Sequence, residues 1–454
     1  MISSSSFRAE VRANLRIAVP LIAAQMAGVG MGTIDTVMAG RISDAALAAV
    51  SVGSNLNVTF FVFMMGVLMA CSPIVAQRAG AGHADLRVGA FVREALLLAV
   101  GLAALWTATA HLLAAPILTH IGLVPDTATT AVQFLRAYSW SSFGFCIWFV
   151  LRYTAEGVGT TRPIFWSGVV GLCSNLLFDW IFMYGKFGFP AMGAVGCGWA
   201  TTLSSLLMAA VLAVQYSWHE PLRVFQILQR VRPHLEREAR EILRLGIPIG
   251  LILTAEAGLF VAVSLLMARF GDEAVAAYQV ALNFASVMFM IPLGVGLATT
   301  VRVGHAVGAG DPAEARQRGY VGMCLGAINA ASNAALMLLF PAFIAGFYTD
   351  NGKIVSIAAA YLCLAAAFQL FDGLQVTANG ALRGIKDTRI PMLITVAAYW
   401  LVGMPVALWL AFRAGLGPSG LWWGLTAGLA VAALGLSLRF RSKSQRLKSY
   451  LVMS

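Results

Sequence analysis

Long runs of apolar residues alternate with short polar segments along the whole chain. Each run has about 20 residues or more, which is enough for an α-helix to cross the roughly 30 Å hydrocarbon core of a bilayer. In lipid the backbone polar groups must be satisfied internally, so the pattern predicts an all-α integral membrane protein. We expect twelve transmembrane helices, at about residues 17–40, 46–75, 89–115, 128–152, 163–185, 194–217, 245–268, 274–301, 317–347, 354–381, 390–413 and 418–438.

The two halves of the chain carry related sequences. An offset of 228 residues aligns 15–82 with 243–310 without a gap, and 20 of these 68 pairs are identical. Six helices per half is an even number, so the halves enter the membrane in the same direction and are related by an axis along the membrane normal. We expect two pseudo-symmetric six-helix lobes, an N-lobe (1–217) and a C-lobe (245–438), with a cytoplasmic amphipathic link (218–244) and a basic cytoplasmic tail (439–454).

The positions of Lys and Arg indicate the orientation in the membrane. With the N-terminus inside, the cytoplasmic segments carry 25 of these residues and the outer loops carry 5, while Arg136 lies within the fourth helix. Cytoplasmic loops are enriched in Lys and Arg, so we expect both termini to be cytoplasmic. The predicted location is the inner (plasma) membrane of a bacterium.

Composition excludes several classes of protein. Of the 454 residues 59% are hydrophobic and only 11% are charged, against about 25% charged in a soluble domain. The net charge of +11 is explained by the inner loops, so we expect no nucleic-acid partner. The chain has no Walker phosphate loop, no CxxC pair and no HExxH spacing, which argues against an ATP-driven pump, a structural zinc site and a metalloprotease. We expect neither enzymatic activity nor a cofactor other than a coupling ion.

Three acidic residues lie inside apolar runs, namely Asp35, Glu256 and Asp372. A charge at the bilayer centre is costly, so an intramembrane acid indicates a functional site. The sequence repeat supports this interpretation, because Asp35 aligns with Val263 and Glu256 aligns with Gly28. Acids that only stabilised a duplicated scaffold would be repeated in both halves.

Further polar residues accompany these acids. Asn175 and Asp179 are four residues apart, which places them on one helix face, and we group them with Asp35, Glu256 and Asp372 as ion-coupling residues. Carboxylate and amide oxygens around a cavity suit either a proton or Na⁺. The predicted substrate-binding residues are Asn57, Thr201, Gln279, Asn283 and Phe368, although helix–helix hydrogen bonding explains Gln279 and Asn283 equally well.

Several segments of the chain match a known pattern. They are Pro20 with Asp35, Pro73–Gly82, Asn175-xxx-Asp179, Gly193–Thr201, Pro248 with Glu256, and Asp372 followed by Gly380-Ala-Leu-Arg-Gly-Ile-Lys-Asp-Thr-Arg389. Through these segments the chain resembles the MATE family of multidrug transporters, and within it the NorM-like branch. The resemblance covers nearly all of the chain.

This resemblance implies export of bulky amphipathic drugs, often organic cations, in exchange for inward Na⁺ or H⁺ through alternating access of the two lobes. It also implies a cation site in the C-lobe at Glu256 and Asp372, for which Na⁺ is a candidate, and one in the N-lobe at Asp35, Asn175, Asp179 and Thr201. Some relatives have a Tyr one turn before the acid of the tenth predicted span (354–381), where this chain has Phe368 before Asp372. We expect a carrier that works as a monomer in the lipid bilayer.

A second function in the same superfamily is the flipping of lipid-linked oligosaccharides. Such a carrier needs basic residues in the membrane to bind a polyanionic headgroup. Here the predicted midplane is acidic and Arg136 is the single basic candidate, which favours drug efflux. An intramembrane enzyme is disfavoured because the spans contain no convincing set of nucleophile, base and metal ligands.

Overall fold

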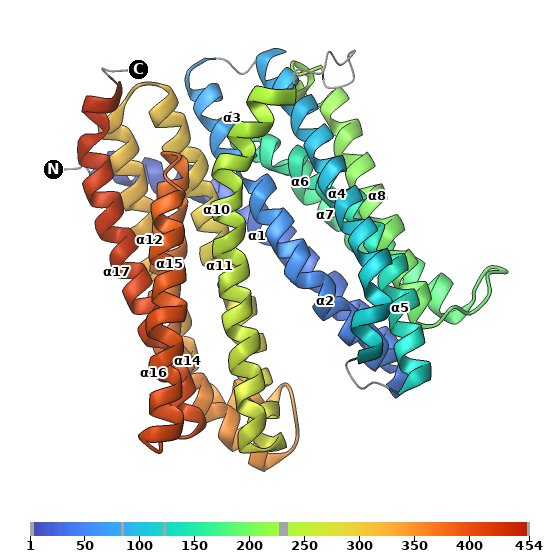
Figure 1. Cartoon of the computed structure of the whole chain (residues 1–454). Helices are drawn as coiled ribbons and strands as arrows, with labels where there is room; N and C mark the ends of the chain where they lie inside the picture. The colour runs from blue at the N-terminus through green and yellow to red at the C-terminus, as the bar shows by residue number, and fades with distance from the viewer. Residues whose placement is uncertain (1–3, 83–85, 121–123, 227–234, 452–454) are drawn as a thin grey trace. The chain divides into compact units, whose positions relative to one another are not determined.

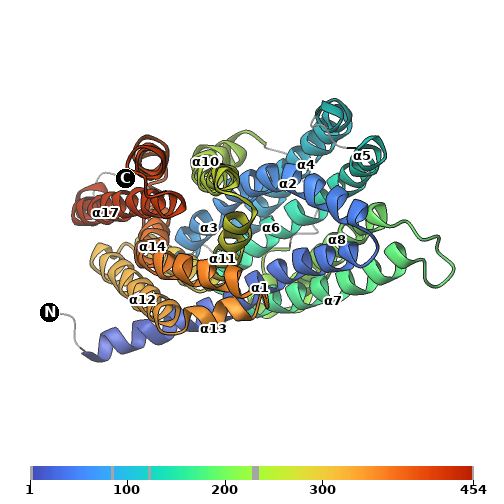
Figure 2. The same cartoon turned by 90° about the horizontal axis from the view of Figure 1, so that it is seen from below.

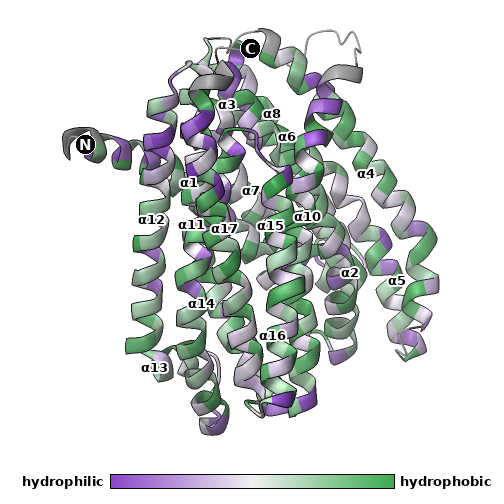
Figure 3. Cartoon of the chain, turned by 60° about the vertical axis from the view of Figure 1, so that its left-hand side comes forward, coloured by the Kyte–Doolittle hydropathy of each residue, from purple (hydrophilic) through white to green (hydrophobic). Residues whose placement is uncertain are grey.

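The computed structural model describes residues 4–82, 86–120, 124–226 and 235–451 (Figures 1 and 2). Within these residues eleven helices are long and apolar enough to cross a membrane, and no strand occurs. Figure 3 shows hydrophobic residues along most of α4 (Leu86–His120). The all-α membrane fold predicted from the sequence is confirmed.

The helices of the first half follow the predicted spans closely, with two divisions. The second span consists of two helices that meet at Ala70, and the fourth consists of two that meet at Trp140. The helices besides α4 are α1 (Ser4–Gly40), α2 (Asp44–Met69), α3 (Cys71–Gly80), α5 (Pro125–Ser139), α6 (Ser141–Val158), α7 (Arg162–Tyr184), α8 (Ala194–Trp218) and the short α9 (Glu220–Arg223).

The helices of the second half contain more irregular turns. They are α10 (Leu235–Met267) with a 3₁₀ turn η1 (Ala268–Phe270), α11 (Asp272–Gly308), α12 (Pro312–Leu339), α13 (Pro341–Gly346), α14 (Gly352–Gly384), α15 (Arg389–Ala397), α16 (Met404–Leu408) and α17 (Pro418–Leu451). Two π turns, η2 (Ala398–Gly403) and η3 (Trp409–Arg413), flank α16.

Two segments differ from the sequence prediction. The link was expected to be a separate amphipathic helix, but its last part from Leu235 is continuous with α10, while 227–234 lies outside the described residues. The tail predicted after residue 438 begins as a continuation of α17, which runs to Leu451. Charged residues at helical spacing extend these helices past the apolar spans, so hydropathy alone places the start of α10 too late and the end of α17 too early.

Packing divides the chain into two compact units. The N-unit contains Ala23–Ala79 and His83–Gly250, and the C-unit contains Met1–Ile22, Gly80–Gly82 and Leu251–Ser454. These boundaries differ from the predicted lobe boundaries. In the N-unit α8 packs against α5, α6 and α7, and in the C-unit α14 packs against α11, α12 and α17. The first turns of α1 therefore pack with the second half of the chain, and the first half of α10 packs with the first half of the chain.

Close helix crossings explain why the start of α1 packs in the C-unit and the start of α10 packs in the N-unit. In the C-unit a Cβ added to Gly294 of α11 would lie 2.3 Å from the Ile22 side chain of α1. In the N-unit a Cβ added to Gly66 of α2 would lie 2.5 Å from the Cα of Gly250 in α10. The two crossings are related by the 228-residue offset of the repeat. Each depends on a glycine that lets two backbones approach.

An ion pair accompanies each crossing. Glu10 of α1 accepts hydrogen bonds from the guanidinium of Arg302, and Arg318 lies 3.6 Å from the same carboxylate. Glu238 of α10 is bound by Arg78 of α3. Glu10 and Glu238 are also 228 residues apart, so the repeat has kept the acid while the position of its basic partner changed.

Candidate functional site

The N-unit brings three helices together around Asp35. This side chain is buried, with 8% of its surface exposed. The amide Nδ2 of Asn175 in α7 donates a hydrogen bond to Asp35 Oδ1 at 3.0 Å, and the hydroxyl of Thr201 in α8 donates to Asp35 Oδ2 at 3.2 Å. Each oxygen of the carboxylate thus has one donor.

Asp179 completes this cluster but is held differently. Ligand atoms of Asp35, Asp179 and Cys197 all lie within 4.8 Å of one another, and all three residues are buried. Within the described residues neither carboxylate oxygen of Asp179 has a hydrogen-bond partner, and the same holds for Asn175 Oδ1. Two carboxylates at this distance repel if both are charged, whereas a shared proton supplies the missing donor.

Helical spacing accounts for the arrangement. Asn175 and Asp179 are one turn apart on α7, and Cys197 and Thr201 are one turn apart on α8, so each helix presents two polar groups on one face. Glycines near the N-terminus of α8 let it approach its neighbours, since a Cβ on Gly196 would lie 2.7 Å from the backbone of Phe182. The structure therefore places Asp35, Asn175, Asp179 and Thr201 together.

Asn57 is buried, and no hydrogen bond among the described residues joins it to Asp35 or Asp179. Its Oδ1 accepts a hydrogen bond from Trp106 Nε1 at 2.8 Å, and the Trp106 ring stacks on Phe60 with a centroid distance of 4.4 Å. Sequence reasoning missed Trp106 and Cys197. An isolated Trp or Cys in an apolar span gives no signal that separates it from core packing.

The C-unit brings Glu256 and Asp372 within electrostatic range of each other. Asp372 of α14 is buried, and Glu256 of α10 is partly buried. Tyr399 in the π turn η2 is fully buried and lies within electrostatic range of both acids. Within the described residues Tyr399 Oη and Asp372 Oδ1 have no hydrogen-bond partner.

Tyr399 supplies a phenol near the acids although position 368 does not. Trp400 Nε1 donates to the carbonyl oxygen of Ala255 at 3.2 Å, which ties η2 to α10 next to Glu256. A π turn inserts an extra residue into a helical turn, and such turns often occur at functional sites. Sequence reasoning missed Tyr399, because neither the π turn nor this contact leaves a mark in the hydrophobic pattern.

The remaining predicted residues of the C-unit lie elsewhere. Phe368 is in the core, where its ring contacts Phe260 and Trp422 at centroid distances of 5.8 and 6.3 Å. Gln279 is exposed and donates to Ser264 Oγ, and Asn283 is exposed and accepts from Tyr348 Oη. No hydrogen bond among the described residues joins Gln279 or Asn283 to Glu256 or Asp372.

The two clusters offer different ligand atoms to a cation. In the N-unit both oxygens of Asp35 already accept hydrogen bonds and a thiol, a poor ligand for a hard cation, lies beside the acids. The free oxygens of this cluster are those of Asp179 and Asn175 Oδ1, and a proton shared with Asp35 satisfies Asp179. In the C-unit the buried Oε1 atoms of Gln369 and Gln375 lack partners within the described residues. The N-unit cluster fits a proton, and the C-unit residues include the oxygen ligands that Na⁺ accepts.

Comparisons with known proteins agree with this architecture. The MatE family model matches the chain twice, at residues 20–181 and 248–409. The second match is displaced from the first by the 228 residues of the predicted repeat, which is confirmed.

Relatives of similar length share more than a third of their residues with the chain. A probable multidrug resistance protein NorM from Xanthomonas axonopodis pv. citri is 39% identical over 449 residues, covering 98% of this chain and 97% of that protein. The multidrug resistance protein PmpM of Pseudomonas aeruginosa is 38% identical over 443 residues, covering 97% and 93%.

Solved structures show the same fold. The eukaryotic MATE transporter AtDTX14 superposes with a TM-score of 0.86 at 23% identity, covering 98% of this chain and 99% of that chain. An outward-facing multidrug resistance MATE family transporter superposes with a TM-score of 0.88 at 20% identity, covering 97% of each chain. The duplicated helical fold, the two family matches and the full-length relatives show that the chain belongs to the MatE family and is a membrane transporter rather than an enzyme.

Proposed function

We propose that this chain exports amphipathic drugs, many of them organic cations, in exchange for protons that enter from outside the cell. The family and the names of the full-length relatives support multidrug efflux. The observation that carries the coupling ion is the buried pair Asp35 and Asp179, whose carboxylates lie within 4.8 Å of each other. A transporter without coupling would have no use for two costly acids inside its spans.

The donors around the pair favour a proton over Na⁺. Asp35 receives one hydrogen bond on each oxygen, which stabilises its charged form, while Asp179 receives none from the described residues. Burying two unpaired charges is expensive. In the proposed resting state one proton bridges the two acids, with the negative charge mainly on Asp35.

Transport follows because a proton and a cationic substrate compete for the negative charge of the Asp35 and Asp179 pair. Removal of the proton leaves two carboxylates close together, a state that a cationic substrate stabilises and that a proton entering from outside reverses. A ligand shifts a conformational equilibrium only by its differential affinity for the two states. We propose that the protonated carrier and the substrate-bound carrier favour opposite conformations, one open to the cytoplasm and the other open to the outside. We further propose that the carrier is a monomer in the cell membrane with both termini in the cytoplasm.

The acids of the C-unit form a second proposed cation site. Glu256, Asp372 and Tyr399 lie within electrostatic range of one another, and unpartnered glutamine oxygens lie on the same helix as Asp372. Na⁺ at Glu256 and Asp372 stays a prediction. Transport assays with and without Na⁺ test this prediction. A Na⁺ requirement in wild type that is absent in Asp372→Asn would support the site.

Export from cells tests the proposal. Cells that express Asp35→Asn or Asp179→Asn should accumulate a fluorescent organic cation as strongly as cells without the transporter, because neither variant retains the acid pair. Asp44→Asn is the matched control, because Asp44 is an exposed acid at the start of α2, and it should export normally. Normal export by both Asp35→Asn and Asp179→Asn at equal expression would refute the proposal.

The flippase alternative is less well supported. Arg136 is exposed and donates to the backbone oxygen of His111. Arg152 is buried, but its guanidinium lies over the rings of Trp148 and Tyr153 at 4.9 and 5.4 Å. Accumulation of lipid-linked oligosaccharide in a deletion strain, with unchanged drug efflux, would favour flipping instead.

A further inference from the structure

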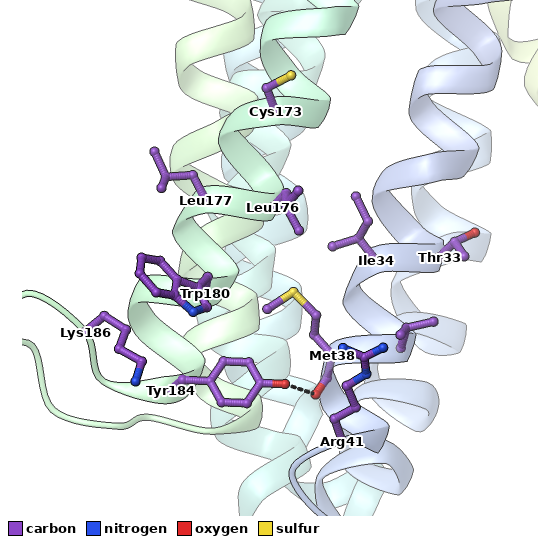
Figure 4. A pocket seen from close by; sticks show the side chains of 11 residues that line it. Thr33, Ile34, Met38, Arg41, Cys173, Leu176, Leu177, Trp180, Tyr184 and Lys186 are labelled. Atoms are coloured by element: carbon purple, nitrogen blue, oxygen red, sulfur yellow. Dashed lines mark hydrogen bonds between the residues drawn. The ribbon is translucent and has the colours of Figure 1, made fainter.

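A groove of about 800 Å³ lies on the N-unit between α1 and α7 (Figure 4). Its walls are apolar for most of their length, with Ile34 and Val37 on α1 and Leu176 and Leu177 on α7. Leu176 and Leu177 are about half exposed. Half-exposed leucines on a membrane-spanning helix are typical of a surface that contacts lipid rather than water.

One end of the groove is basic and aromatic. Arg41 follows the last turn of α1, and Lys186 follows the last turn of α7. Lys186 Nζ lies 6.0 Å from the centroid of the Trp180 ring, and Tyr184 Oη donates to the backbone oxygen of Met38 at 3.1 Å. Trp, Tyr, Lys and Arg gather at the level of the lipid headgroups, so this end marks a membrane surface.

The two cations at this end have no acidic partner. Within the described residues neither Arg41 nor Lys186 forms an ion pair, and no acid lines the groove. Asp35 is on α1 as well, but its carboxylate accepts hydrogen bonds from Asn175 and Thr201. The positive end would repel a cationic substrate and attract an anionic group.

The dimensions of the groove fit one leaflet. From Cys173 to Tyr184, α7 rises about 16 Å at 1.5 Å per residue. Half of the roughly 30 Å hydrocarbon core is about 15 Å, so an acyl chain whose headgroup lies at Arg41 and Lys186 would reach the far end of the groove.

We propose that this groove binds an anionic phospholipid, with an acyl chain along Ile34, Leu176 and Leu177 and the phosphate group between Arg41 and Lys186. Under the predicted orientation the lipid belongs to the outer leaflet. Basic pockets between transmembrane helices bind anionic headgroups on the cytoplasmic side of membranes, and the same charge attraction acts at the outer surface. The site is independent of the proposed drug transport.

Lipid titration of the purified full-length protein tests the proposal. Phosphatidylglycerol and phosphatidylcholine with identical acyl chains are added in detergent, and bound lipid is counted by native mass spectrometry. We expect phosphatidylglycerol to bind wild type about tenfold to thirtyfold more tightly, since two basic residues contribute to the headgroup. Raising the salt concentration should reduce this preference.

Variants locate the binding to the groove. Arg41→Gln with Lys186→Gln should lower the affinity for phosphatidylglycerol to that for phosphatidylcholine. The matched control is Arg269→Gln with Arg413→Gln, which removes two exposed cations from the other half and should keep the preference. Cys173→Trp fills the far end of the groove and should weaken the binding of both lipids. Gel filtration and thermal unfolding check that each variant folds.

Three results would overturn the proposal. Equal affinity of wild type for the two lipids would mean that the groove does not recognise an anionic headgroup. Equal loss of preference in the groove variant and its control would mean that net charge alone attracts the lipid. Unchanged phosphatidylglycerol binding by Cys173→Trp would place the lipid outside the groove.

Discussion

Asp35 and Asp179 are chemically alike but differ in their hydrogen bonds. Asp35 is held by an amide and a hydroxyl, while Asp179 has the carboxyl of Asp35 and the thiol of Cys197 as close neighbours. Hydrogen bonds to the charged form of an acid favour that form. Under the proposed proton coupling, this asymmetry favours the charge on Asp35 and the exchangeable proton between the two acids.

The phenol of Tyr399 provides a prediction for the C-unit. Tyr399→Phe keeps the buried ring but removes the hydroxyl that lies near Glu256 and Asp372. We expect drug transport to fall about tenfold, because the variant lacks a hydroxyl that has no hydrogen-bond partner among the described residues and is therefore free to bind a cation or a carboxylate during transport. Transport rates in proteoliposomes at matched protein content measure the effect.

The control for this prediction is Tyr320→Phe, on α12 of the same unit, where the ring contacts Phe440 and Arg316. It should transport at the wild-type rate. Equal rates for Tyr399→Phe and wild type would show that the phenol does not act with the acids.

The sequence predicts the members of the N-unit cluster better than those of the C-unit cluster. Asp35 is visible as an acid in an apolar run, and the four-residue spacing of Asn175 and Asp179 follows from helix geometry. Tyr399 approaches Glu256 only because a π turn and the Trp400 hydrogen bond place it there. Helical periodicity carries no information on such a local irregularity.

Among the helices, the repeat-related crossings decide which segments pack together. Gly66 with Gly250 and Gly294 with Ile22 occupy equivalent positions, and each joins the first helix of one half to the second helix of the other. Helix association in lipid depends on close packing and interhelical hydrogen bonds, because lipid is as apolar as the side chains. The glycines therefore contribute much of the stability of these contacts.

Gly66→Ala tests the contribution of the crossing. Its Cβ would lie 2.5 Å from the Cα of Gly250, so α2 and α10 must move apart. We expect the protein to be destabilised by about 1–3 kcal/mol, the usual cost of overpacking. Thermal unfolding in detergent measures the change.

Gly101→Ala in α4 is the matched control, because nothing lies within 4 Å of the added Cβ. Alanine is favoured over glycine inside a helix by about 0.5–1 kcal/mol, so this variant should unfold at the same or a higher temperature. A Gly66→Ala protein as stable as Gly101→Ala would contradict the importance of the crossing.

Hydropathy predicts where helices cross the membrane but not where they break or begin. The fourth span divides at Trp140, and the spacing of its apolar residues gives no sign of this break. The start of α10 at Leu235 lies in a charged segment that hydropathy assigns to the link. Arg78 binds Glu238 in these charged turns of α10. The two residues are 160 positions apart in the chain, so the local pattern of hydrophobic residues does not reveal their contact.

For the whole molecule, the main inference is that a duplicated scaffold carries unduplicated acids. The family model matches both halves at the same offset, yet Asp35 aligns with Val263 and Glu256 aligns with Gly28. Duplication provides two similar helical frames, and the acids make them chemically different. The proposed transporter thus couples a proton in the N-unit, with a separate cation site in the C-unit.

Proton release on substrate binding tests the central claim most directly. Purified protein is placed in weakly buffered detergent solution without Na⁺, and an organic cation is added while pH is recorded. The account predicts release of protons by wild type and by Asp44→Asn, but no release by Asp35→Asn or Asp179→Asn, because only the intact pair holds an exchangeable proton. Substrate binding by wild type without a pH change, or release that persists in both acid variants, would contradict proton coupling at this pair.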